Sequence, residues 1–146
     1  MKARYLLRTL GAMSILLLAV QMLHAADLSK AKCPVSGRAV AEEYAVSFAG
    51  GKVYFCSDNC VPLFSHNSAT YAVKAHHQLA VTGQAKQEKC PLTGKPIDTT
   101  KTVDIDGVSV GFCCEKCQDK ISKETRDQQM QDCFNPEAFK KAFKVQ

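Results

Sequence analysis

Two stretches of the chain show the alternation of apolar and polar residues that is typical of paired strands. In the first, residues 44–48 alternate, Gly50-Gly51 signals a turn, and residues 52–55 return as the partner strand. In the second, an Asp-Gly turn separates residues 101–105 from residues 109–112 in the same way. The pattern therefore predicts two β-hairpins, one in each half of the chain.

Helical patterns follow both hairpins. Ser57 suits the N-cap of a helix that we expect to reach about Phe64, and a second helix is expected over residues 69–79. After the second hairpin we expect one long helix over residues 115–131, and Asn135-Pro136-Glu137 begins a last helix. The residues expected to fill the core between hairpins and helices are Tyr54, Phe55, Phe64, Tyr71, Phe112, Ile121, Phe139 and Phe143.

The cysteines relate the two halves of the chain to each other. Each half contains a Cys-Pro turn that ends in glycine and then two cysteines four positions apart, in the order Cys-x22-Cys-x3-Cys. The copies are offset by 57 residues without a gap, which identifies an internal duplication. Segments 67–71 and 135–139 resemble each other at an offset of 68, which predicts an insertion of about eleven residues in the second copy. Residues that recur unchanged 57 positions later include Cys33, Pro34, Gly37, Val46, Gly50, Phe55, Cys56 and Cys60.

Residues 1–25 have the pattern of a secretory signal peptide. Three basic residues precede the mostly apolar stretch 10–20, and small residues before Ala26 suit cleavage. The apolar stretch is too short to span a bilayer, which disfavours the alternative of an uncleaved anchor. We therefore expect a periplasmic or secreted protein with no stable membrane insertion after cleavage.

Cleavage of this leader changes the charge of the chain and defines its domains. The leader holds three basic and no acidic residues, so the formal net charge falls from +5 to +2. So small a charge gives no reason to expect a nucleic-acid partner. The remaining chain divides into a first module at 26–80, a linker at 81–89 and a second module at 90–146. All eight cysteines lie after the leader, where they or a metal add stability that a small core lacks.

Three cysteines in each half are expected to converge on one point. Residues i and i+4 share a helix face, so Cys56 and Cys60 are expected to point the same way. Thiolates near a helix N-terminus are favoured by the helix dipole, and soft sulfur ligands suit Zn²⁺ or copper as Cu(I). The predicted metal ligands are Cys33, Cys56 and Cys60 in the first half and Cys90, Cys113 and Cys117 in the second.

Tetrahedral zinc takes a fourth ligand, whose identity the sequence leaves open. The candidates are a water, a side chain of an unknown protein partner, His66, His76, His77 and Cys133. Cys114 replaces Ser57 of the first copy, and we expect it to lie outside the shared site as a partly buried small residue. Its alternative roles are an extra copper-binding or redox thiol, or a disulfide with Cys133.

The alternatives to metal binding use the same cysteines differently. An even number of cysteines in an oxidising destination fits a disulfide-stapled structural or interaction module. A thiol redox protein that uses Cys113, Cys114 and Cys117 is a third reading, but no thioredoxin-like pattern accompanies it. The chain has no Ser/His/Asp arrangement, no suggestive carboxylate pair and no glycine-rich phosphate loop. We therefore expect a binding protein and not an enzyme.

The duplicated pattern resembles the YHS/TRASH family of small metal-binding modules. The Cys-x22-Cys-x3-Cys spacing, the Phe-Cys strand end and the later Asn-Pro-Glu helix carry the resemblance, over about residues 33–75 and 90–145. It implies an α+β fold of two tandem treble-clef-like modules that bind metal in a trafficking, sensing or accessory role. Many family members carry their turn cysteine three residues later, where this chain has Ser36 and Thr93.

Overall fold

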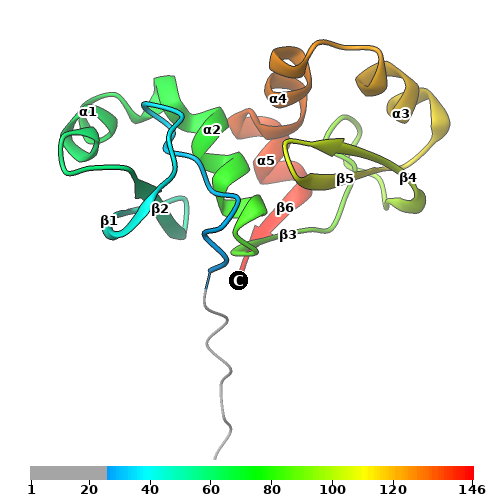
Figure 1. Cartoon of the computed structure of the whole chain (residues 1–146). Coiled ribbons are helices and arrows are strands. Elements are labelled where there is room, and N and C mark those ends of the chain that lie inside the picture. The colour runs from blue at the N-terminus through cyan, green and yellow to red at the C-terminus, as the bar shows by residue number, and fades with distance from the viewer. Residues whose placement is uncertain (1–25) are drawn as a thin grey trace, which may run out of the picture.

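The computed structural model describes residues 26–146, and the predicted signal peptide at 1–25 lies outside the described residues. The described chain has an α+β fold of short antiparallel strand pairs and helices, which confirms the predicted fold class (Figure 1). None of the helices in this part of the chain is both long and apolar enough to cross a membrane.

Both predicted hairpins are present. Their strands are β1 (Ala41–Phe48) with β2 (Gly51–Phe55), and β4 (Asp98–Ile105) with β5 (Val108–Phe112). The first turn is Ala49-Gly50, with φ values of 49° and 89°, and lies one residue before the predicted Gly50-Gly51. Asp106-Gly107 forms the second turn with φ values of 48° and 87°. Two consecutive residues with positive φ make a type I′ turn, which matches the twist of a hairpin.

The helices of the first half lie close to their predicted positions, whereas those of the second half differ in number. They are α1 (Cys60–His66), α2 (Ser68–Val81), α3 (Glu115–Ser122), α4 (Arg126–Phe134) and α5 (Pro136–Ala142). The prediction of one helix over 115–131 is wrong, because Thr125 and Gln128 form a capping box that starts α4. Ser57 is not an N-cap either, since Asn59 precedes α1. Asn135 caps α5 and Pro136 is its first residue, as predicted.

A short antiparallel pair joins the two halves of the molecule. β3 (Ala85–Gln87) pairs with β6 (Phe143–Val145), and Lys86 faces Lys144 at its centre. The segment 81–89 expected as a linker therefore contains a strand. Ala85 lies 25 positions after Cys60, and Phe143 lies 26 positions after Cys117. Since these spacings differ by one, the predicted insertion is not a net gain in length: the additional helix α4 before α5 is offset by α5 itself, which has 7 residues where α2 has 14.

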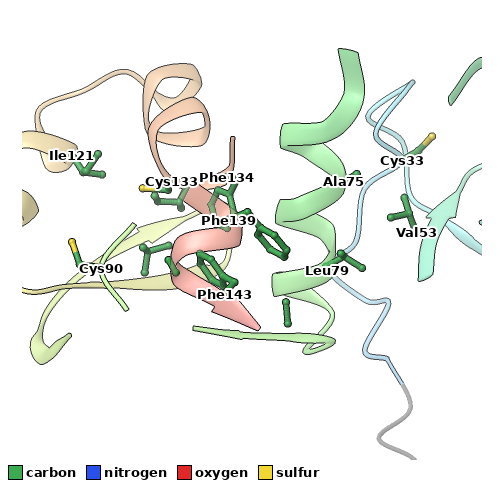
Figure 2. Close-up of a cluster of buried hydrophobic side chains, with 14 of the residues drawn as sticks. Cys33, Val53, Ala75, Leu79, Cys90, Ile121, Cys133, Phe134, Phe139 and Phe143 are labelled. Atoms are coloured by element: carbon green, nitrogen blue, oxygen red, sulfur yellow. The ribbon is translucent and has the colours of Figure 1, made fainter. Parts of the chain in front are cut away.

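One hydrophobic core extends through both halves. In Figure 2, α2 lies between the side of the molecule that carries Cys33 and the side that carries Cys90. The ring of His76 on α2 stacks on Phe139 of α5, with centroids 4.2 Å apart, and Phe139 stacks on Phe143. All predicted core residues are buried except Tyr71, which is half-buried. The shared core therefore places the two Cys-Pro turns on opposite sides of α2.

Candidate metal centres

The first and fourth cysteines of the chain lie in two equivalent tight turns. The amide of Cys33 donates to the carbonyl of Arg38 at 2.8 Å, and the amide of Gly37 donates back to the carbonyl of Cys33 at 2.8 Å. Cys90 and Gly94 repeat these bonds at the same distances. Both glycines have φ values near +74°, in the left-handed region that glycine adopts without strain. The turn holds each cysteine in the protein interior, where it is at most 1% exposed.

The other two cysteines of each half reach the site from a strand end and a helix start. Cys56 follows β2 and Cys60 is the first residue of α1, so the two do not share one helix face as predicted. Cys113 likewise follows β5, and Cys117 lies in the first turn of α3. The bend between strand and helix turns each pair of side chains toward the Cys-Pro turn. In each half the three predicted sulfurs lie within 4.8 Å of one another.

The sulfur distances fit a single metal ion in each cluster. Zinc binds cysteine sulfur at about 2.3 Å, so two sulfurs of a tetrahedral site lie about 3.8 Å apart. The Sγ atoms of Cys56 and Cys60 are 3.6 Å apart, and those of Cys113 and Cys117 are 3.9 Å apart. Three thiols at this spacing form a soft donor set that can hold Zn²⁺ or Cu(I).

A hydroxyl group contacts each cluster from the Cys-Pro turn. Ser36 Oγ lies 3.1 Å from Cys56 Sγ and accepts a hydrogen bond from the amide of Arg38. In this contact either the hydroxyl or the thiol can donate the hydrogen bond. Thr93 Oγ1 lies 3.2 Å from Cys113 Sγ in the second cluster. The two hydroxyls therefore contact the strand-end cysteines from the Cys-Pro turns, a role that sequence analysis did not assign to them.

A glutamine side chain ties the two cysteine-bearing segments together in each half. The amide nitrogen of Gln78 donates to the carbonyls of Lys32 and Tyr54, and its oxygen accepts from the amide of Tyr54 at 2.7 Å. Gln87 makes the same three bonds to Lys89 and Gly111. These backbone positions correspond at the offset of 57 residues, but the glutamines do not, since one lies on α2 and the other on β3. The duplication therefore gave no signal that could identify them.

The thiols of each cluster differ in acidity. Burial raises the pKa of Cys33, but hydrogen bonds from Ser36 and from backbone amides outweigh this and bring the pKa to about 7. Cys90 has a pKa of about 7, again because hydrogen bonds outweigh its burial. Burial raises the pKa of Cys60, and burial together with neighbouring thiols raises that of Cys117 to about 12. In each cluster the cysteine of the Cys-Pro turn therefore ionises at a lower pH than the cysteine of the helix.

We expect the metal affinity of both clusters to fall steeply on acidification. Metals bind thiolates, so every thiol protonated in the metal-free protein must lose its proton on binding. Above about pH 7 the turn cysteines Cys33 and Cys90 are already ionised. Below this pH they are protonated, so metal binding has to release one additional proton from each site. Each displaced proton lowers the apparent affinity about tenfold per pH unit. Competition titration of zinc against a chromophoric chelator at several pH values measures this slope, and a pH-independent affinity would contradict thiolate coordination.

The residues considered as a fourth ligand lie elsewhere. His76 and His77 each place a ring nitrogen 2.9 Å from a backbone carbonyl oxygen of the second half, and His66 is exposed at the end of α1. Cys133 is fully buried in the core, and burial raises its pKa to about 12. Within residues 26–146, neither group of three sulfurs gains one of these side chains.

Cys114 differs from its prediction in both position and environment. It is exposed and not partly buried, and its sulfur lies close to the second cluster, 3.6 Å from Cys117 Sγ. The considered disulfide with Cys133 is not formed, since all eight cysteines are free thiols. Sequence analysis placed Cys114 outside the shared site because the first copy has a serine there.

Comparison of the chain with family models, with curated proteins and with solved structures returned no match. The geometry of the structure shows two groups of three cysteines, each of which can hold a metal ion.

Proposed function

We propose that this protein binds a soft metal ion in each of its two three-cysteine clusters. Zinc is the favoured ion and Cu(I) is the alternative, because both prefer cysteine sulfur. The observation that carries the proposal is the convergence of three sulfurs to within 4.8 Å in each half. The ligands are Cys33, Cys56 and Cys60 in one site and Cys90, Cys113 and Cys117 in the other.

Electrostatics supports a cation at these positions. Two unit charges 4 Å apart interact by about 4 kcal/mol at an effective dielectric constant of 20, so neighbouring thiolates repel one another strongly. A divalent ion at the centre replaces this repulsion by attraction, and the protons of the thiols leave on binding. The hydroxyls of Ser36 and Thr93 and the paired glutamines recur in both halves, so the surroundings of the cysteines support the same arrangement twice.

The proposed setting is metal handling in the periplasm or outside the cell, as a buffer, chaperone or accessory protein. The leader pattern at residues 1–25 and the resemblance to YHS/TRASH modules support this setting. A bound ion also protects thiols from oxidation in such a compartment, because a coordinated thiolate is less available to react. No catalytic step is proposed for the protein.

The test is the metal content and the stability of the purified protein. We expect two metal ions per chain by elemental analysis, and we expect a strong chelator to lower the free energy of unfolding. A ligand at 1,000 times its Kd stabilises a fold by about 4.1 kcal/mol per site, so urea unfolding with and without chelator should differ clearly. Four disulfides in metal-free protein would overturn the proposal and support the disulfide-stapled module instead.

A further inference from the structure

The second cluster has one more sulfur beside it than the first. Cys114 Sγ lies 3.8 Å from Cys113 Sγ and 3.6 Å from Cys117 Sγ, and these two ligands are 3.9 Å apart. Sulfurs bound to one tetrahedral zinc ion are separated by about 3.8 Å. The three sulfurs therefore form a triangle with the dimensions of one face of a ZnS₄ tetrahedron.

The first cluster contains the same triangle with oxygen at one corner. Ser57 Oγ lies 3.9 Å from Cys56 Sγ and 3.8 Å from Cys60 Sγ, and these two sulfurs are 3.6 Å apart. Ser57 corresponds to Cys114 at the offset of 57 residues. The two sites thus differ at this corner by one atom, and a neutral hydroxyl is a much weaker ligand for a soft metal than a thiolate.

Cys114 lies at the start of α3, beside the second cluster. It occupies the N-cap position of α3 with an extended backbone, but it accepts no capping hydrogen bond from the helix. Because the residue is exposed, packing leaves its sulfur free to move onto an ion. Cys90 supplies the remaining corner, since its sulfur lies within 4.8 Å of those of Cys113 and Cys117; the sulfur of Cys114 lies farther than this from Cys90 and has to move toward the ion.

We infer that the two sites are unequal, with a closed second site and an open first site. This inference rests on the proposed function, because it requires both clusters to bind metal. Zinc with four protein ligands is held as a structural ion, whereas a site with three keeps a position open for water or an incoming ligand. The first site then exchanges its ion with a partner or with solvent, and the second retains its ion. The second site consists of Cys90, Cys113, Cys114 and Cys117.

Two reciprocal substitutions test the inference, with Co²⁺ as a spectroscopic probe in the reduced full chain. The intensity of the sulfur-to-cobalt charge-transfer band increases with the number of Co–S bonds. With two ions bound we expect seven such bonds in the natural protein, six in Cys114→Ser and eight in Ser57→Cys. Because Ser57 stands at the matching position of the first copy, Cys114→Ser is compatible with the fold.

Zinc affinities measured by chelator competition complete the test. Cys114→Ser should weaken the tighter site, and Ser57→Cys should strengthen the weaker one, each by more than about tenfold, since even outer-shell partners of a metal are worth about 10–100-fold. The unaltered site in each variant is the internal control for folding. Two bound ions with the same band and affinities in Cys114→Ser would overturn the inference and leave the proposed function standing. Failure of all three proteins to bind metal would overturn both.

Discussion

A protein that carries Cys56→Ser is expected to bind one metal ion per chain in place of two. Cys56 supplies one of three sulfurs in the first cluster, and the hydroxyl that replaces it is a poor ligand for a soft ion. Structural zinc contributes about 10–16 kcal/mol of apparent binding free energy in small folds, most of which depends on the full ligand set. The remaining two thiolates should lose their ion to a chelator that the natural site resists. Elemental analysis after dialysis against that chelator measures the change.

Two control variants distinguish ligand loss from general damage. Cys113→Ser should weaken the second site without emptying it, because Cys90, Cys114 and Cys117 remain as ligands, and should leave the first site unchanged. Cys133→Ala should keep both ions, since Cys133 is a buried core residue outside the clusters, and should cost only about 1–2 kcal/mol of stability. Retention of two ions by Cys56→Ser, or loss of one by Cys133→Ala, would show that the ligands are assigned wrongly.

Replacement of Gln78 by alanine is expected to destabilise the metal-free protein by about 2–5 kcal/mol. Its side chain is 1% exposed and satisfies three backbone groups, on Lys32 and Tyr54, that alanine leaves without a partner. Each unpaired buried polar group costs about 1–3 kcal/mol. Lys32 precedes Cys33 and Tyr54 lies two residues before Cys56, so the first site should also bind zinc more weakly. Urea unfolding and chelator competition measure the two effects.

The matched control for this prediction is Gln87→Ala. Gln87 makes the equivalent three hydrogen bonds in the second half, but it is only half-buried, so water can replace part of its role. We expect a smaller loss of stability and a weakened second site. A loss below about 0.5 kcal/mol for Gln78→Ala would indicate that the glutamine does not hold the two segments together.

The hairpins and the two clusters were predictable because their determinants are local and occur twice. Positive φ at Gly50 and Gly107 lets each hairpin turn tightly, and the Cys-Pro turns end at glycines that adopt the left-handed conformation. The first turn was placed one residue late, since the alternation of side chains does not show which two residues take positive φ. The duplication then identified the three cysteines that converge in each half.

The features missed by sequence analysis depend on contacts between distant segments or on overlooked local signals. The capping box of Thr125 and Gln128 is a local signal for a new helix, and it breaks the helix expected over 115–131. Strands β3 and β6 have three residues each, too few for an alternating pattern, and they exist because they pair across the molecule. Gln78 and Gln87 share contacts but not sequence position, so the repeat could not reveal them.

The pairing of β3 with β6 has the symmetry of a contact between two identical subunits. Lys86 faces Lys144 at the centre. On either side Ala85 pairs with Val145 and Gln87 pairs with Phe143, so the first residue of each strand faces the last residue of the other, as at an isologous dimer interface. Two separate copies of one module, joined through such an edge, would form a homodimer. In such a homodimer every substitution appears in both subunits, so the two centres must stay alike. Fusion into one polypeptide removes that constraint, and it allows serine at position 57 beside cysteine at position 114.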